Sequence, residues 1–233
     1  MPYHNSLNDS PTLGQKNNST MDFIAEKLLD YVVENSQDEP KLLAELTRDT
    51  HLKVLQPRML SGPLQGRFLS LLSKLMAPKR ILEVGTFTGY ATLCLAEGLP
   101  KDGIIDTLDK NEELLHFQRS FFDRSPWGKQ IFQHCGNAID LIPTLNGNYD
   151  MVFLDADKKN YLNYLKLIIP RLNKGGLLLS DNVLWSGKVL EETHKNDTDT
   201  AVLKEFNTLV AKHPSLETVL LPLRDGLTLS RKI

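Results

Sequence analysis

From Arg80 onward, short apolar runs alternate with segments of helical periodicity. The runs are RILEVG, GIIDTLD, KQIFQH, YDMVFLD and GGLLLSD. Buried parallel strands read as continuous apolar runs, and strands that alternate with helices form βαβ units. The pattern therefore predicts an α/β fold with a doubly wound sheet that is covered by helices on both faces.

The two ends of the chain follow different patterns. LETVLLPL and GLTLSRKI alternate apolar with polar residues and are joined through RDG, which predicts a terminal antiparallel hairpin. Ahead of the sheet, helical spacing predicts N-terminal helices in MDFIAEKLLDYVVENSQ, EPKLLAELTRDTHLK and GRFLSLLSKLMA. We expect residues 1–20 to form a flexible polar arm and residues 21–233 to form a single domain.

Composition and charge narrow the function classes. The 233 residues carry 27 basic and 29 acidic side chains, a formal charge of −2, so we expect no nucleic-acid partner. No apolar stretch approaches the roughly 20 residues that span a bilayer, so we expect no membrane partner. The polar N-terminus has no secretory pattern, and we expect a cytoplasmic protein whose Cys94 and Cys135 are reduced, mostly buried thiols.

A strand, a glycine turn and a helix follow one another in ILEVGTFTGYATLCLAEGL. Gly85 and Gly89 allow a tight turn and close approach to a ligand. A dinucleotide site needs G-x-G-x-x-G, whereas this spacing is G-x-x-x-G, and Glu83 would repel a pyrophosphate. Glu83 suits an ammonium instead, and Asp109 at the next strand end suits ribose hydroxyls. An adenosine with a cationic amino-acid tail and no phosphate is S-adenosylmethionine.

Two further strand candidates end in oxygen ligands. Asp155 follows MVFL, and Asp181 and Asn182 follow GGLLLS. The carboxyl ends of neighbouring parallel strands share one crevice, so these side chains should converge. Oxygen donors without nearby His or Cys indicate a hard cation such as Mg²⁺, Mn²⁺ or Ca²⁺. The alternative is that one Asp caps a helix and the other caps a turn.

Lys158 and Trp185 lie close to these strand ends. Lys158 is three residues after Asp155, where a nearby cation would ease deprotonation of its amine and suit it as a general base. A lone Lys in a DKKN run is more often a solvated surface residue. Trp185 suits the wall of an aromatic pocket or, equally, core packing.

Taken together, these motifs resemble the cation-dependent O-methyltransferases, the family that includes caffeoyl-CoA and catechol O-methyltransferases. The resemblance runs from about Met59 to Ile233 through EVGTFTGYATL, DTLDKNEE, FLDADKKNYLNY, SDNVLWSGKV and RDGLTLSRKI. It implies a seven-stranded mixed sheet of the Rossmann-like methyltransferase fold and, commonly, a homodimer. The implied reaction moves the methyl group of S-adenosylmethionine to a hydroxyl of a small aromatic vicinal diol.

The resemblance also implies residue roles. Asp155, Asp181 and Asn182 would hold the metal, with Asp155 facing the substrate and Lys158 taking the hydroxyl proton. Ser186 matches a substrate-contacting position. The implied cofactor residues are Ser61, Glu83, Gly85, Thr86, Ala91, Asp109, Ala138 and Asp157. Three positions depart from the family pattern: Ala91 replaces a frequent Ser, with Thr92 as a substitute hydroxyl, Asn137 replaces Asp, and Arg67 replaces Gln.

Other functions fit the sequence less well. A metal-independent S-adenosylmethionine methyltransferase acting on another small acceptor would use the cofactor residues without the cation. A receiver-like sensor also places Asp and Lys around Mg²⁺, but has no use for Glu83 before a glycine turn. The glycine spacing disfavours an NAD enzyme. The acceptor itself is not encoded in any motif.

Overall fold

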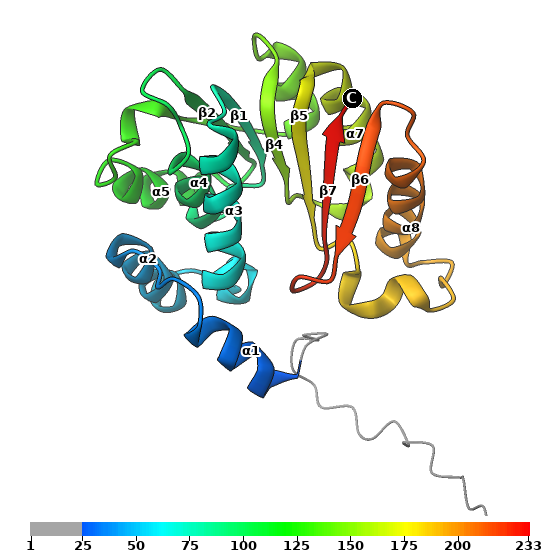
Figure 1. Ribbon diagram of the computed structural model, residues 1–233, viewed down its shortest axis with the longest axis horizontal. Helices are drawn as coiled ribbons and strands as arrows, with labels where there is room; N and C mark the ends of the chain where they lie inside the picture. Colours follow the sequence, from blue (N-terminus) through cyan, green and yellow to red (C-terminus); the bar gives the residue numbers. More distant parts are fainter. Residues whose placement is uncertain (1–24) are drawn as a thin grey trace, which may run out of the picture.

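The computed structural model describes residues 25–233, which form a seven-stranded sheet in the order β3-β2-β1-β4-β5-β7-β6 (Figure 1). β1 to β5 are parallel to one another, whereas β7 is antiparallel to both β5 and β6. The strands are β1 (Arg80–Val84), β2 (Ile104–Asp109), β3 (Ile131–Cys135), β4 (Tyr149–Leu154), β5 (Leu172–Asp181), β6 (Leu216–Leu221) and β7 (Leu227–Lys232). The predicted mixed sheet with a terminal antiparallel pair is confirmed.

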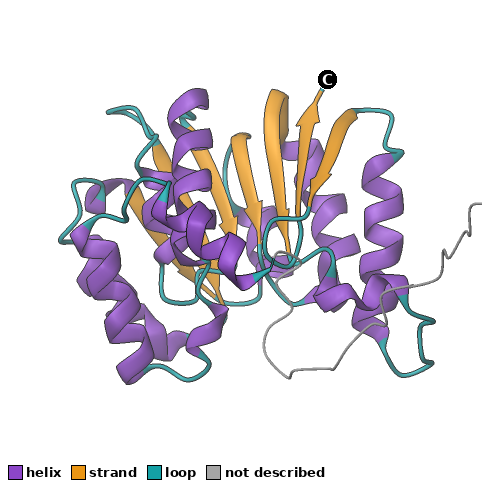
Figure 2. Cartoon of the chain, turned by 60° about the horizontal axis from the view of Figure 1, so that its bottom comes forward, coloured by secondary structure: helices purple, strands orange, loops and turns teal. Residues whose placement is uncertain are grey.

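Helices lie on both faces of the sheet (Figure 2). The helices are α1 (Glu26–Glu34), α2 (Lys41–Lys53), α3 (Gly62–Met76), α4 (Tyr90–Ala96), α5 (Leu115–Phe122), α6 (Ala138–Leu141), α7 (Tyr161–Ile168) and α8 (Thr198–Ala211). Short 3₁₀ turns are η1 (Pro57–Met59), η2 (Glu112–Leu114), η3 (Gly128–Gln130), η4 (Ile142–Thr144), η5 (Lys158–Asn160), η6 (Ile169–Arg171) and η7 (Trp185–Leu190). The three predicted N-terminal helices correspond to α1, α2 and α3, and the predicted arm, residues 1–20, lies outside the described residues.

Alternate residues of each central strand pack into two different hydrophobic clusters, one on each face of the sheet. Ile81 and Met151 are register partners that pack in one buried cluster with α3 and α4. Their neighbours Leu82 and Val152 are also partners and pack in the opposite cluster with α7 and α8. Because successive strand side chains point to opposite faces, a sheet that is buried on both faces needs continuous apolar runs. This explains why the strand candidates could be read so directly from the sequence.

The strand order also determines where a ligand can bind. The strand order reverses at β1: the chain runs from β1 to β2 and β3 on one side, and then crosses back to β4 and β5 on the other side. In open α/β sheets, ligands bind outside the carboxyl strand ends at this switch point. These ends lie at the lower edge in Figure 1, where the β6–β7 turn and the segment after β5 also lie.

The structure also shows the length of the helices and the exposure of the two cysteines. No helix among residues 25–233 is long and apolar enough to cross a bilayer. Cys94 is buried, but Cys135 at the end of β3 is exposed, so the expectation of two mostly buried thiols was wrong for Cys135. β3 is an edge strand, which leaves its end open to solvent.

Candidate active site

The glycine turn after β1 brings the carboxyl ends of β1 and β4 into contact. Gly85 has a φ of +103°, and a Cβ there would lie 1.8 Å from the backbone oxygen of Asp155. The Asp155 amide in turn donates to the Val84 oxygen at 2.8 Å. Only glycine fits this position, because a side chain would separate the two strand ends. The turn thus joins the predicted cofactor loop to the predicted metal and catalytic residues.

Glu83 lies beneath this turn and is fully buried. Its Oε2 accepts hydrogen bonds from the Thr107 hydroxyl at 2.5 Å and from the Thr92 hydroxyl. Burial raises the pKa of the Glu83 carboxyl to about 8. The hydroxyl that was expected to compensate for Ala91 is therefore already bound to Glu83.

The other Glu83 oxygen, Oε1, is buried and has no hydrogen-bond partner among the described residues. A buried acceptor without a partner costs free energy, which a ligand donor would recover. A cationic ammonium would also favour the charged carboxylate. This environment fits the amino-acid tail inferred from the sequence.

Asp109 braces the same loop from the end of β2. Its Oδ2 accepts the Thr86 and Phe87 amides at 3.1 and 2.7 Å, and its Oδ1 accepts the Asn111 amide at 2.9 Å. A carboxylate oxygen has two lone pairs, so Oδ1 retains acceptor capacity for a ribose hydroxyl. Asp109 therefore both shapes the turn and suits the role that the sequence predicted.

The remaining predicted cofactor residues lie on the elements around the same sheet edge. Ser61 precedes α3, Ala91 is buried in α4, and Ala138 begins α6 after β3. The carboxylate of Asp157, after β4, accepts hydrogen bonds from the Tyr164 hydroxyl at 2.6 Å and from the Asn160 side-chain Nδ2 at 2.5 Å. The tertiary structure thus brings to one edge residues from four loops of the sheet and from α3.

The two predicted metal carboxylates lie at the carboxyl ends of neighbouring strands: Asp155 follows β4 and Asp181 is the last residue of β5. Leu154 of β4 and Ser180 of β5 are register partners, so Asp155 and Asp181 are the next residues along each strand. Asp181 is almost fully buried, and burial together with the charge of Asp155 raises its pKa to about 6. A divalent cation between them would relieve this repulsion.

Asn182 follows Asp181 in the left-handed region, with a φ of +56°. Asn tolerates that conformation better than most residues. The Asn182 backbone N–H donates to Asp181 Oδ1 at 2.8 Å. The carboxylates of Asp155 and Asp181 and the side-chain amide oxygen of Asn182 together form an oxygen-donor set for a hard cation. No group of three His, Cys, Asp or Glu side chains in residues 25–233 forms an alternative metal site.

Lys158 is buried beside these carboxylates. It lies in η5, and its Nζ donates to Asp155 Oδ1 at 3.1 Å and to the Tyr161 hydroxyl at 2.7 Å. Tyr161, fully buried, donates its own proton to the backbone oxygen of Asp181 at 2.8 Å. The surface reading of Lys158 is therefore wrong, whereas Lys159 is exposed.

Trp185 and Ser186 lie in the turn after Asn182. Both have positive φ, 48° and 54°. Trp185 is half-buried and packs against the core of the α7–α8 face, which supports its packing interpretation. Ser186 is exposed, and its amide donates to Asp225 Oδ1.

Four residues at the site were missed by the sequence reasoning. Gln65 donates to Asp181 Oδ2 at 2.6 Å, and Arg224 donates to the Ser61 oxygen. Tyr161 and Asp225 contact Lys158 and Ser186, respectively. Tyr161 carried a readable signal, since it is three residues after Lys158 at helical spacing. The others come from a distant helix and from a turn that was read only as a hairpin.

Known O-methyltransferases resemble this chain in sequence. The O-methyltransferase family profile matches residues 33–233. The chain is 34% identical to caffeoyl-CoA O-methyltransferase 2 of Petunia hybrida over 95% of each chain. It is 35% identical to the catechol O-methyltransferase of Niastella koreensis, over 75% of this chain and 82% of that protein.

Solved structures show the same fold. A methyltransferase of Podospora anserina with S-adenosylhomocysteine bound superposes with a TM-score of 0.82 and 27% identity, covering 95% of this chain and 100% of that one. An O-methyltransferase of Bacillus cereus, also with S-adenosylhomocysteine, gives a TM-score of 0.82 at 27% identity, covering 89% and 97%. With the family profile and the glycine loop in agreement, the chain belongs to the O-methyltransferase family and is an S-adenosylmethionine-dependent enzyme.

Proposed function

We propose that this enzyme is a divalent-cation-dependent O-methyltransferase whose acceptor is an aromatic vicinal diol. The observation that carries the proposal is the convergence of Asp155, Asp181 and Asn182 beside a buried Lys158. Caffeoyl and catechol groups, named in the relatives above, both carry neighbouring phenolic hydroxyls. Two oxygens on adjacent ring carbons suit chelation of one cation.

The cation would supply Lewis acidity and orientation: when bound, it lowers the pKa of a chelated phenol and fixes its position. Lys158 then accepts the hydroxyl proton at Nζ. The phenolate oxygen forms a bond to the methyl carbon as the carbon–sulfur bond of S-adenosylmethionine breaks, which leaves S-adenosylhomocysteine. No covalent enzyme intermediate is required.

The protein's contribution is mainly positioning. Gly85 packs against Asp155, so the cofactor loop and the acceptor site are held at a fixed separation. Holding reacting groups in line can contribute roughly 7–11 kcal/mol in favourable cases. The proposed cofactor contacts are Ser61, Glu83, Gly85, Thr86, Ala91, Asp109, Ala138 and Asp157, and the proposed substrate contacts are Asp155, Trp185 and Ser186.

Methyl transfer from labelled S-adenosylmethionine to a panel of catechols, with Mg²⁺ or with EDTA, tests the proposal. We expect turnover that requires both the cation and the vicinal diol. Monohydroxylated analogues of each acceptor are the matched controls. Turnover that EDTA leaves unchanged would instead favour a metal-independent methyltransferase and would leave the cofactor assignment intact.

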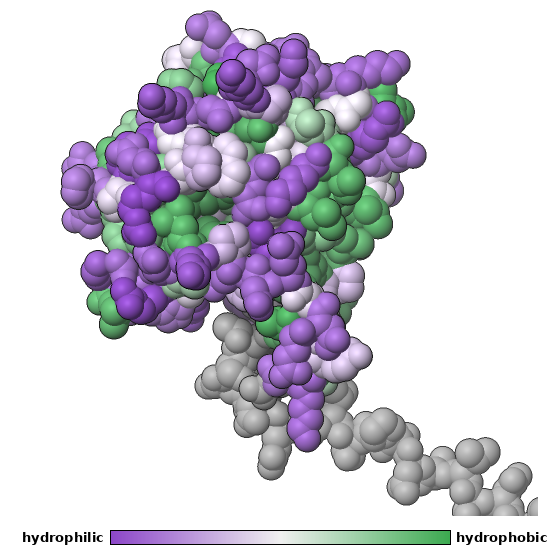
Figure 3. Space-filling view, turned by 60° about the vertical axis from the view of Figure 1, so that its left-hand side comes forward, coloured by the Kyte–Doolittle hydropathy of each residue, from purple (hydrophilic) through white to green (hydrophobic). Residues whose placement is uncertain are grey.

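We also propose that the chain forms a homodimer, which rests on the exposed apolar side chains of α3 and β6. Leu71 and Leu75 on α3 are 58% and 73% exposed, and Val219 on β6 is 52% exposed. Figure 3 shows apolar areas between the polar side chains on the side that carries α2 and α3. Such areas mark association surfaces. Light scattering after size exclusion tests this proposal, and a monomeric wild type at micromolar concentration would contradict it.

A further inference from the structure

The β6–β7 turn lies between two walls of the site. Its residues Leu223–Gly226 follow β6 and lead into β7 at the sheet edge that holds the strand ends (Figure 1). Its Asp-Gly pair predicts only a hairpin turn, and the proposed reaction gives its side chains no role. Arg224 and Asp225 nevertheless make side-chain contacts to different parts of the site.

Arg224 contacts the α3 wall. Its Nη1 donates to the Ser61 oxygen and, at 3.4 Å, to Oε1 of Gln65. The Gln65 side chain is fully buried, and its Nε2 donates to Asp181 Oδ2 at 2.6 Å. An amide has one acceptor end and one donor end, so occupying Oε1 with Arg224 turns the donor end toward Asp181. Arg224 therefore orients Asp181 through Gln65.

Asp225 contacts the opposite wall, the segment after Asn182. Its Oδ1 accepts the Ser186 amide, and its backbone oxygen accepts the Leu184 amide at 2.9 Å. Next to it, the Gly226 oxygen accepts the Val183 amide at 3.2 Å. The turn thus holds three backbone amides of the segment that carries Trp185 and Ser186.

This segment needs external support because its backbone is strained. Trp185, Ser186 and Gly187 have consecutive positive φ values of 48°, 54° and 79°. Non-glycine residues in the left-handed region cost about 1–3 kcal/mol each and persist where the surroundings fix them. The contacts from Asp225 and Gly226 are such surroundings.

Arg224 is itself in the left-handed region, with a φ of +50°. Glycine would adopt this conformation without strain. The Arg224 side chain donates hydrogen bonds to Ser61 and Gln65, and these contacts help to offset the backbone cost. Glycine at position 224 would therefore remove the side-chain contacts without adding backbone strain to the turn.

We propose that the β6–β7 turn is a brace that positions both walls of the acceptor site, Arg224 acting on Asp181 through Gln65 and Asp225 acting on the Trp185–Ser186 segment. Both are positioning residues, because neither is among the proposed metal, cofactor or substrate contacts. The inference rests on the proposed function. It adds Arg224 and Asp225 as the residues that determine how the acceptor fits into its site.

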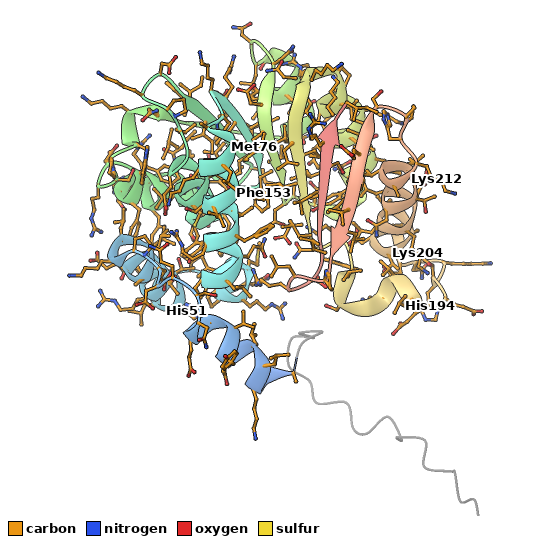
Figure 4. The ribbon with its side chains drawn as sticks, in the orientation of Figure 1. His51, Met76, Phe153, His194, Lys204 and Lys212 are labelled. Atoms are coloured by element: carbon orange, nitrogen blue, oxygen red, sulfur yellow. The ribbon has the colours of Figure 1, made fainter. Side chains whose placement is uncertain are left out.

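The Arg224 half is tested with Arg224→Gly, which relieves backbone strain and removes the side-chain contacts. The matched control is Ala77→Gly, since Ala77 also has positive φ, 45°, but follows Met76 at the far end of α3 from the site (Figure 4). We expect Arg224→Gly to weaken Mn²⁺ binding by about 10-fold or more in calorimetry, as for other partners of metal ligands, with Ala77→Gly unchanged.

The Asp225 half is tested with Asp225→Ala and the conservative Asp225→Asn, whose amide oxygen still accepts the Ser186 N–H. We expect Asp225→Ala to raise the KM for a catechol by about 10-fold without changing S-adenosylhomocysteine affinity, and Asp225→Asn to restore most of it. Amide hydrogen exchange at residues 182–187 should accelerate in Asp225→Ala but not in Ala77→Gly.

The outcomes distinguish the brace from the proposed reaction. Unchanged Mn²⁺ affinity in Arg224→Gly would overturn the Arg224 half of the brace. Unchanged KM and exchange in Asp225→Ala would overturn its other half, with the reaction intact. A wild-type enzyme that binds no Mn²⁺ would overturn the cation assignment, while the exchange measurement still decides whether the turn supports residues 182–187.

Discussion

The Nζ of Lys158 lies 2.7 Å from the hydroxyl of Tyr161, whose own proton is donated to the backbone oxygen of Asp181. The Tyr161 oxygen therefore presents a lone pair to Lys158. With Asp155 Oδ1 as a second acceptor, two N–H bonds of a neutral Lys158 amine are fixed. The lone pair on Nζ must then occupy the one remaining tetrahedral position. Tyr161 therefore orients the proposed base.

Removing the Tyr161 hydroxyl should impair proton transfer more than binding. We expect Tyr161→Phe to lower kcat by about 10-fold, less than the roughly 10²–10⁴-fold that a general base contributes, with little change in KM. Tyr149→Phe is the matched control, because Tyr149 is also fully buried but its hydroxyl has no hydrogen-bond partner among residues 25–233. Steady-state kinetics of both variants decides the point, and equal kcat values would remove Tyr161 from this role.

Neutralising Asp181 should abolish cation binding but leave cofactor binding largely intact. We expect Asp181→Asn to lose Mn²⁺ binding and most turnover while S-adenosylhomocysteine affinity changes less than about 3-fold, since Asp181 is not among the proposed cofactor contacts. Calorimetric titration with each ligand measures this. Asp150→Asn, at the opposite end of β4, is the control. Normal methylation by Asp181→Asn without added cation would contradict the mechanism.

Glu83 should make the stability of the ligand-free enzyme depend on pH. Its pKa is raised from 4.5 to about 8, so the folded state binds more protons than the unfolded state in this window. Stability is therefore fully present below the unfolded pKa and is lost as pH rises through the folded pKa. For one group the slope is at most roughly 1.4 kcal/mol per pH unit.

Urea unfolding between about pH 7 and 8 reports on this effect with little contribution from Asp181, because a carboxyl with a pKa of about 6 is mostly ionised by pH 7. We expect the decline in the free energy of unfolding to be smaller in Glu83→Gln than in the wild type. Parallel curves for the two proteins would show that Glu83 does not control the decline. Glu83→Gln should also weaken S-adenosylmethionine binding, since it removes the charge opposite the ammonium.

A methyl group at Gly85 should be more damaging than one at Gly62. Ala at Gly85 would meet the Asp155 backbone at 1.8 Å, whereas Ala at Gly62, also at positive φ, meets nothing within 4 Å. We expect Gly85→Ala to cost about 3 kcal/mol or more and Gly62→Ala about 1 kcal/mol of unfolding free energy. Chemical denaturation of both variants measures the difference, and equal costs would mean that the contact with Asp155 is relieved by backbone movement.

The strands, the glycine turn and the order of carboxylates along the chain could all be predicted from local sequence patterns. Strands buried on both faces require continuous apolar runs, and parallel strands place their carboxyl ends at one edge. Asp155, Asp181 and Asn182 could be grouped from the sequence for that reason. The role of Lys158 was suggested by its spacing, but its burial was not.

The distant groups that support these residues become apparent only when the chain is folded. Gln65 reaches Asp181 across 116 positions of sequence, and Arg224 reaches Gln65 across 159. No periodicity encodes such contacts, since they depend on how α3 and the β6–β7 turn pack over the sheet edge. The burial of Glu83 was likewise hidden, because a strand-end carboxylate reads the same whether it faces solvent or lies beneath a turn. Local patterns specify elements, whereas desolvation and long-range hydrogen bonds arise only when those elements pack together.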